Sequence, residues 1–279
     1  MKIEKEWEQR EKDGVTYLII PAFERTGVVD HGFSTRLGGV SEGHFASMNL
    51  GVTRGDDPAK VEENYRIFCN AIGVDPKRVV LTQQTHTDNI RVVTEEDCGK
   101  GVYKERDYTD IDGLITDVPG IPLVTFFADC VPLIFLDPVK RVLASVHSGW
   151  RGTVQKIGTK AIRMMVEDYG CRVEDILAAI GPCIGPCHYE VDEPCAQEFR
   201  KAYPDDEDFI LEELDTPGKY LLDLPMANVI QFLDCGILEE HISMANRCTY
   251  CEPDLFFSHR EMGDKRGNLA MVIQLRPEA

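Results

Sequence analysis

The sequence has no hydrophobic run long enough to cross a membrane. Its most apolar stretch, residues 121–136, is interrupted by Pro122, Asp129 and Pro132, whereas a spanning helix needs about 20 apolar residues. Residues 1–10 are polar, carry charges of both signs and lack the apolar core of a secretory signal. These absences predict a cytoplasmic protein.

Cysteine is too sparse for a disulfide-built scaffold, and basic residues are in the minority. The ten cysteines in 279 residues are about 4%, below the roughly 8–10% of such scaffolds, so in a reducing compartment we expect thiols, core residues or metal ligands. The 30 basic residues are outnumbered by 48 acidic ones, for a net charge of -18, and no Lys/Arg-rich run occurs. Such a chain repels nucleic acid and anionic membranes, which favours a small-molecule ligand.

No internal repeat, low-complexity tract or Pro/Gly/Ser-rich linker divides the chain, which predicts a single domain over residues 1–279. Hydrophobic residues, at 43%, are sufficient for a substantial core. Short β-like runs alternate with amphipathic helices, which predicts a layered α/β architecture. The expected strands cover residues 15–20, 78–81, 123–127, 133–136, 142–146, 176–180 and 269–275.

Capping residues and apolar periodicity predict three helices. The first begins after Asp57, which caps it, has Pro58 at its first position and ends at Gly73. The other two are expected over residues 153–169 and 224–235. Very short links between neighbouring strands, at 129–132 and 137–141, favour antiparallel pairs and therefore a mixed sheet.

Three segments place reactive side chains at the ends of predicted strands, where active-site residues commonly lie. They are residues 83–86, 128–130 and 147–152. Zinc prefers a ligand set such as the imidazoles of His86 and His147 with the thiolate of Cys130. Three protein ligands leave one tetrahedral position open for a catalytic water. The pattern alone leaves open a second interpretation, in which these are core histidines and a buried cysteine.

Two glycine-containing turns are candidate anion sites. The turn at 149–153 leads into a helix, and helix N-termini offer free N–H groups and a positive dipole end. Gly149 and Arg151 in this turn, and Arg36 in the turn at 34–39, are candidate phosphate contacts. The alternative is an ordinary tight turn in each case, with Trp150 packed in the core.

Cys248 and Cys251 form a Cys-x-x-Cys pair, with Cys183 and Cys187 upstream. A structural zinc site and a redox pair are both compatible with such cysteines. The spacing of the upstream pair is wider than that of the downstream pair, which argues against a metal at these four residues. We expect the remaining histidines to be structural: His31, His44, His188, His241 and His259.

A series of short stretches occurs in the order typical of one protein family. The chain resembles the YfiH/YlmD-type proteins, also labelled polyphenol oxidase or laccase-domain proteins, which are regarded as zinc-dependent purine nucleoside phosphorylases. The resemblance runs from about His31 to the C-terminus, and the number of ordered matches makes it specific. The matching stretches are 31–36, 49–51, 84–86, 112–114, 128–132, 147–152, 181–185, 189–191, 248–251 and 256–260.

The resemblance implies an activity and a cofactor. It implies phosphorolysis of adenosine, inosine, guanosine and methylthioadenosine, together with adenosine deamination. Carried over residue by residue, it implies zinc ligands at His86, Cys130 and His147, with copper able to bind in vitro because copper outcompetes zinc at most nitrogen and sulfur sites.

Further roles at this site follow as expectations. Asp129 or Asp112 would orient a ligand imidazole or shuttle a proton, since ligand imidazoles usually hydrogen-bond to a neighbouring acceptor. Phosphate or substrate contacts are expected from Arg36, Gln84, Gly149 and Arg151. The chain departs from the family at two positions: Thr87 replaces the usual glycine after the first ligand, and Ser148 replaces the common alanine after the third.

Three other functions remain open from the sequence. In a second interpretation the protein is a cysteine hydrolase, with Cys130 as the nucleophile and His147 as the base. The older copper phenol-oxidase label is a third, although a multicopper site needs about ten His and Cys ligands by family analogy and this chain has seven histidines. A non-catalytic regulator that binds a nucleoside or metal, or a role in editing a cell-wall precursor, is the fourth.

Overall fold

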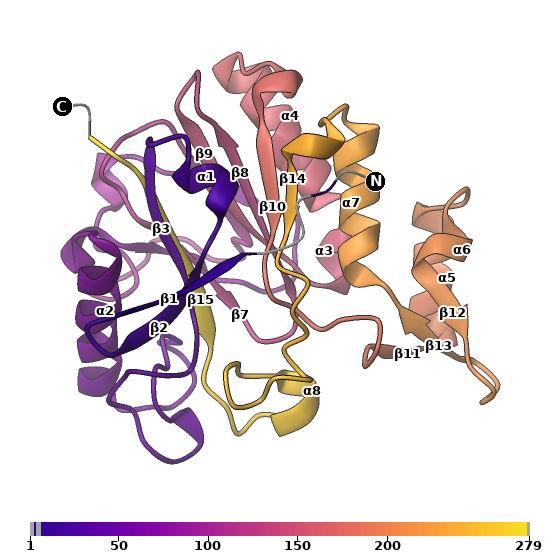
Figure 1. Cartoon of the computed structure of the whole chain (residues 1–279), viewed down its shortest axis with the longest axis horizontal. Coiled ribbons are helices and arrows are strands. Elements are labelled where there is room, and N and C mark those ends of the chain that lie inside the picture. Colours follow the sequence, from indigo (N-terminus) through magenta and orange to yellow (C-terminus); the bar gives the residue numbers. More distant parts are fainter. Residues whose placement is uncertain (1–2, 4–6, 278–279) are drawn as a thin grey trace.

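Two six-stranded sheets form the centre of the molecule in the computed structural model, which describes residue 3 and residues 7–277 (Figure 1). The remainder of the polar N-terminal stretch discussed above, at 1–2 and 4–6, lies outside the described residues. The first sheet has the order β1-β2-β3-β15-β7-β4 and the second β14-β10-β8-β9-β6-β5. Three neighbouring pairs, β4–β7, β5–β6 and β10–β14, are parallel and the others are antiparallel, so the predicted mixed α/β architecture is confirmed.

The strands have these bounds. The first sheet contains β1 Glu8–Lys12, β2 Val15–Ile19, β3 Val29–Ser34, β4 Val80–Leu81, β7 Leu123–Phe127 and β15 Leu269–Leu275. The second contains β5 Ile90–Val92, β6 Gly113–Thr116, β8 Val131–Asp137, β9 Val142–Ser148, β10 Leu177–Ile180 and β14 Ile242–Met244. A small separate sheet is formed by β11 Glu190–Asp192, β12 Leu211–Glu213 and β13 Lys219–Leu222.

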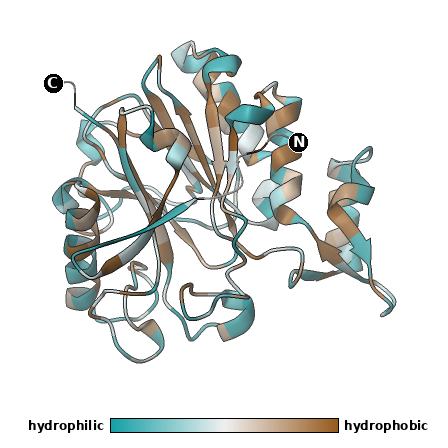
Figure 2. Cartoon of the chain, in the orientation of Figure 1, coloured by the Kyte–Doolittle hydropathy of each residue, from teal (hydrophilic) through white to brown (hydrophobic). Residues whose placement is uncertain are grey.

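The two large sheets pack face to face, with helices on their outer faces. In β15, alternate side chains enter two different cores: Met271 and Ile273 lie between the sheets, whereas Ala270 and Val272 face α2 (Pro58–Ile72). A strand buried on both faces is apolar on both faces, as β15 is over its first five residues, before Gln274. In Figure 2 the central strands are largely hydrophobic, and the helices carry both hydrophobic and hydrophilic residues.

The helices cover the two outer faces. The second sheet packs against α3 (Trp150–Val154), α4 (Ile157–Tyr169) and α7 (Leu224–Asp234). Figure 1 shows α2 on one side of the molecule and α5 (Glu193–Ala202), α6 (Glu207–Ile210) and the small sheet on the other. Two further one-turn helices are α1 (Pro21–Glu24) and α8 (His259–Met262). None of the helices among residues 7–277 is both long and apolar enough to cross a membrane.

The structure confirms some predicted elements and corrects others. Asp57 caps α2, and Gly73 ends it in a left-handed conformation, as expected. The helix expected over 153–169 is two helices, because Lys156 adopts a left-handed conformation (φ 60°) that interrupts the helix between them. The expected hairpin across 129–132 is also wrong: β7 and β8 belong to different sheets, so this link crosses between the layers. The short link at 137–141 does join an antiparallel pair, β8 and β9.

His31 on β3 is buried in a way that requires a neutral imidazole. Its Nε2 accepts a hydrogen bond from the Ile20 N–H at 2.8 Å, and its Nδ1 is buried without a partner among the described residues. Burial, assisted by the charge of Arg10, lowers the pKa of His31 to about 4. Protonation of Nε2 would replace the acceptor of this hydrogen bond with an N–H group that faces the Ile20 N–H.

This burial predicts a loss of stability in mild acid. Because the folded pKa lies below that of the unfolded chain, the unfolded state binds the proton first as pH falls, and stability declines from about pH 6.5 downwards. Between about pH 7 and pH 5.5, the wild type is expected to lose about 1 kcal/mol more than a His31→Gln variant, which keeps an acceptor but does not titrate. Urea unfolding at both pH values measures this difference, and equal losses would contradict the assignment.

Candidate active site

Three ligand atoms converge at one end of the two sheets. His86 lies in the loop from β4 to β5, Cys130 lies in the link from β7 to β8, and His147 lies near the end of β9. All three segments therefore lie where the chain ends a strand or passes between sheets. Their ligand atoms lie within 4.8 Å of one another, with the Cys130 Sγ 3.9 Å from the His86 Nε2.

Strand alternation directs His147 into the space between the sheets. Leu143, Ser145 and His147 share one face of β9, since alternate residues of a strand point the same way. Leu143 belongs to the core between the sheets, and the Ser145 hydroxyl lies 2.7 Å from that of Thr125 on the opposite sheet. The His147 ring accordingly lies 5.9 Å from the Phe127 ring and 5.0 Å from the His86 ring, between centroids.

Asp112 orients both histidines. It is fully buried, and its Oδ1 lies 2.8 Å from His147 Nδ1 and accepts the backbone N–H of His86 at 3.1 Å. Its Oδ2 accepts the backbone N–H groups of Thr85 and Thr87 at 3.1 and 2.9 Å. A carboxylate at His147 Nδ1 leaves Nε2 as the free ligand atom of that ring.

The charges of the cluster support one another. Burial opposes ionisation of Cys130, but the adjacent His147 and His86 lower the pKa of the thiol to about 6. Burial likewise opposes the His147 cation, while Cys130 and Asp112 raise the pKa of His147 to about 9. Thiolate character at neutral pH is the property that a zinc ligand requires.

The donor set and the space around it fit zinc. A Cβ at Gly149 would lie 2.8 Å from His86 Cδ2 and 3.1 Å from Cys130 Sγ, so only glycine lets this backbone pass so close to the cluster. Two imidazole nitrogens and one sulfur within 4.8 Å form a three-ligand set of the catalytic type, which leaves a fourth position open.

A cavity of about 500 Å³ adjoins the cluster, within the roughly 300–1,000 Å³ range of small-molecule sites. His86, Cys130 and His147 all contribute to its wall, and so do Gln84 and Asp129. Apolar and aromatic surfaces are added by Phe126, Phe127, Trp150, Ile184, Tyr189 and Leu224. The cavity therefore combines flat apolar walls with polar groups at one metal-binding corner.

Gln84 and Asp129 are held in place by hydrogen bonds. The Gln84 amide pairs with both backbone groups of Phe126, accepting from its N–H at 2.7 Å and donating to its carbonyl at 2.8 Å. Asp129 adopts φ 85°, and its carboxylate accepts from the Thr249 hydroxyl and the Arg260 backbone N–H, each at 2.6 Å. Asp129 is thus a positioning residue for loops around the cavity, and Asp112 is the one that contacts a ligand histidine.

The two arginines expected to bind phosphate lie elsewhere. Arg36 donates to the carbonyls of Ala46 and Pro253 and lies over the Phe257 ring. Arg151 is exposed and lies over the Trp150 ring. Neither is among the described residues that line the cavity.

Four other arginines line the cavity and were not identified from the sequence: Arg54, Arg106, Arg260 and Arg266. Within the described part of the chain, the Nε atoms of Arg54 and Arg266 are buried without a hydrogen-bond partner. Burial, together with the charge of Arg54, lowers the pKa of Arg266 to about 10. Two guanidinium groups beside one cavity are candidate contacts for an anion.

The two departures from the family pattern are structurally accommodated. The Thr87 hydroxyl donates to Asp112 Oδ2 at 2.9 Å, adding a contact to the carboxylate that holds both histidines. The Ser148 hydroxyl is buried and hydrogen-bonds with Thr153 and Asn228 at 2.9 and 3.0 Å. Both side chains therefore hydrogen-bond to residues around the site, and neither belongs to the described residues that line the cavity.

Sequence comparison assigns the chain to a family. Residues 30–276 match the family described as multi-copper polyphenol oxidoreductase laccase. The chain belongs to this family. It is 38% identical over 251 residues to the purine nucleoside phosphorylase YlmD of Geobacillus stearothermophilus, a match that covers 88% of this chain and 90% of that protein. A purine nucleoside phosphorylase of Bacteroides thetaiotaomicron is 33% identical over 248 residues, covering 88% of this chain and 92% of that protein.

Solved structures of family members share the fold. The hypothetical protein YfiH of Bacillus licheniformis superposes with a TM-score of 0.90 at 34% identity, covering 96% of this chain and 99% of that one. YlmD of Geobacillus stearothermophilus gives a TM-score of 0.88 at 36% identity, covering 96% and 98%. Its family relatives therefore share both the sequence pattern and the architecture of this chain.

Proposed function

We propose that this protein is a zinc-dependent purine nucleoside phosphorylase that acts on adenosine, inosine, guanosine and methylthioadenosine. The observation that carries the proposal is the cluster of His86, Cys130 and His147 at the wall of a cavity large enough for a nucleoside. The relatives named purine nucleoside phosphorylase support the same reaction. When bound, zinc supplies Lewis acidity and lowers the pKa of water in its open position.

The residues of the chain would organise the two substrates. Phe126, Phe127 and Tyr189 provide apolar surface against which a purine can pack. An oxygen of hydrogen phosphate attacks C1′ of the ribose, the bond from C1′ to the purine nitrogen breaks, and the phosphate proton ends on the departing base. The products are the free purine and the sugar 1-phosphate, which is ribose 1-phosphate for adenosine, inosine and guanosine and methylthioribose 1-phosphate for methylthioadenosine.

Arg54 and Arg266 are the proposed phosphate contacts, in place of Arg36 and Arg151. Both residues line the cavity and have a buried Nε–H without a hydrogen-bond partner among the described residues, and a bound phosphate dianion would relieve the repulsion between the two guanidinium groups. An Arg266→Gln variant is expected to raise the KM for phosphate about tenfold, because a charge-assisted hydrogen bond contributes about 1.5–3 kcal/mol. The KM for the nucleoside should change far less. An Arg151→Gln variant is the matched control, and a larger effect there than at Arg266 would overturn the assignment.

Adenosine deamination is the second proposed reaction of the same site. Three protein ligands leave a position for water. In zinc deaminases with mixed His and Cys ligands, water adds at C6 of adenine and the C6–N bond breaks, which gives a C6 carbonyl and ammonia. Deamination needs no phosphate, so it is separable from phosphorolysis by omitting that substrate.

One experiment separates the proposal from its rivals. The zinc-loaded protein is incubated with adenosine, with and without phosphate, and the products are resolved by chromatography. Adenine that forms only with phosphate supports phosphorolysis, and inosine that forms without it supports deamination. Ester hydrolysis that survives a chelator would indicate a cysteine hydrolase, and phenol oxidation that requires copper would indicate the oxidase. Bound zinc without any product would favour a regulatory protein.

A further inference from the structure

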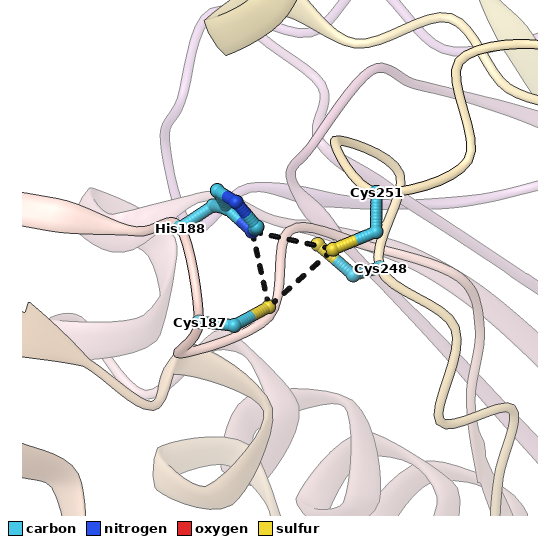
Figure 3. Close-up of side chains that lie close together, drawn as sticks. All are labelled: Cys187, His188, Cys248 and Cys251. Atoms are coloured by element: carbon cyan, nitrogen blue, oxygen red, sulfur yellow. Dashed lines mark hydrogen bonds between the residues drawn. The ribbon is translucent and has the colours of Figure 1, made fainter.

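A second cluster of metal-binding side chains lies outside the proposed catalytic site. It consists of Cys187, His188, Cys248 and Cys251, whose ligand atoms lie within 4.8 Å of one another (Figure 3). The first two precede β11, and the other two follow β14, so two distant segments meet here. The sequence pattern grouped Cys183 with these cysteines. Cys183 is instead buried outside the cluster, and His188, expected to be structural, takes the fourth place.

The three distances among Cys187, His188 and Cys251 are close to those of a tetrahedral zinc site. With Zn–S near 2.3 Å and Zn–N near 2.0 Å, the edges of the tetrahedron are about 3.8 Å between sulfurs and about 3.5 Å between sulfur and nitrogen. The Cys187 and Cys251 sulfurs lie 3.7 Å apart, and each lies 3.2 Å from His188 Nδ1. A disulfide would need about 2.05 Å between sulfurs, so the two cysteines are placed as ligands rather than as a bonded pair.

The surrounding backbone is arranged for thiolate sulfur. The Gly185 N–H donates to Cys248 Sγ at 3.2 Å, and a Cβ at Gly185 would lie 3.3 Å from Cys187 Sγ. The Cys251 N–H closes a tight turn onto the Cys248 carbonyl at 3.1 Å, which brings both sulfurs of the Cys-x-x-Cys pair to one side. The His188 ring stacks on Tyr250 with 4.2 Å between centroids, which fixes its orientation.

We propose that Cys187, His188, Cys248 and Cys251 bind a second, structural zinc ion. Four protein ligands complete the tetrahedron and leave no open position, which distinguishes a structural site from a catalytic one. The soft thiolates select zinc over the hard cations magnesium and calcium. This inference depends on the side chains of the second cluster alone and stands whether or not the chain is a phosphorylase.

The second ion would join two loops that build one wall of the cavity. The segment containing Cys187 also carries Ile184 and Tyr189, both of which line the cavity. The segment containing Cys248 carries Thr249, which donates to Asp129 beside the catalytic cysteine. A metal that crosslinks these segments would therefore fix the part of the cavity wall that contacts Asp129, the residue next to Cys130.

Metal stoichiometry tests the proposal directly. The full chain, purified with a phosphine reductant and without chelator, is expected to contain about two equivalents of zinc by plasma mass spectrometry, one for each site. A Cys187→Ser/Cys251→Ser variant should retain about one, and so should a His86→Asn variant of the catalytic cluster. The combined variant should contain almost none. A Cys195→Ser variant, altered at a half-buried cysteine outside both clusters, should keep both ions.

Cobalt provides a second measurement, and its first reading is made on the unmutated chain, so it does not require a variant to fold. The unmutated chain reconstituted with Co²⁺ should show intense near-ultraviolet charge-transfer absorption from about four thiolates, of which the second cluster supplies about three. The Cys187→Ser/Cys251→Ser variant should lose most of this absorption, and the His86→Asn variant little of it. One equivalent of metal on the unmutated chain, or a mass 2 Da lower after purification without reductant together with no second metal, would overturn the proposal.

Discussion

Replacing Cys130 with serine is expected to reduce zinc affinity and phosphorolysis each by about a thousandfold or more, because a serine hydroxyl stays protonated at neutral pH and is a poor zinc ligand. The adjacent histidines overcome the effect of burial and lower the pKa of Cys130 to about 6, so the wild-type residue is a thiolate at neutral pH. Metal content and the rate of adenine formation measure the two losses. The Cys195→Ser variant is the matched control, since that half-buried cysteine lies outside both metal clusters.

His86 distinguishes a metal mechanism from a cysteine hydrolase. A hydrolase that uses Cys130 as nucleophile and His147 as base has no catalytic task for His86, whereas a zinc site loses a ligand with it. His86 adopts φ 65°, a conformation that asparagine tolerates well, so His86→Asn removes the imidazole without straining the loop. We expect this variant to lose activity about as severely as Cys130→Ser. Retained turnover in metal-free His86→Asn protein would favour the hydrolase.

The elements predicted correctly are those whose signals are local. Asp57, Pro58 and Gly73 mark both ends of α2 by residues at or next to those ends, and β15 is apolar except for Gln274. The break at Lys156 was not predicted because a lysine with φ 60° has no sequence signature, unlike a glycine. The crossing from β7 to β8 was missed because a short link has the same composition whether it forms a hairpin or changes sheets.

The candidate site shows the same division. His86, Cys130 and His147 attract attention in the sequence because each follows a run of strand residues, and strand ends are where loops carry chemistry. Arg54 and Arg266 have no such signal, since they come from two distant loops that the fold brings to one cavity. His188 was expected to be structural for a similar reason, since its neighbour Cys251 lies 63 residues further along the chain.

Replacing Asp112 with asparagine is expected to weaken zinc binding by about a hundredfold, the upper range for removing the partner of a ligand histidine. Asp112 accepts hydrogen bonds through both oxygens, from the backbone around His86 and from His147 Nδ1. An amide has one acceptor oxygen, so in either orientation its NH₂ group faces N–H donors. If it faces His147, that ring must take its proton on Nε2 and lose the free ligand atom.

The same substitution should also cost about 1–3 kcal/mol in the metal-free protein, the penalty for leaving buried donors unpaired. Zinc affinity is measured by competition with a chromophoric chelator, and stability by urea unfolding without metal. Asp110→Asn is the matched control, because Asp110 is exposed in the same segment and hydrogen-bonds the Thr85 hydroxyl rather than a ligand histidine. An Asp112→Asn protein with wild-type zinc affinity would show that the orientation of His147 does not depend on this carboxylate. Other contacts would then have to hold the His147 ring in place for metal binding.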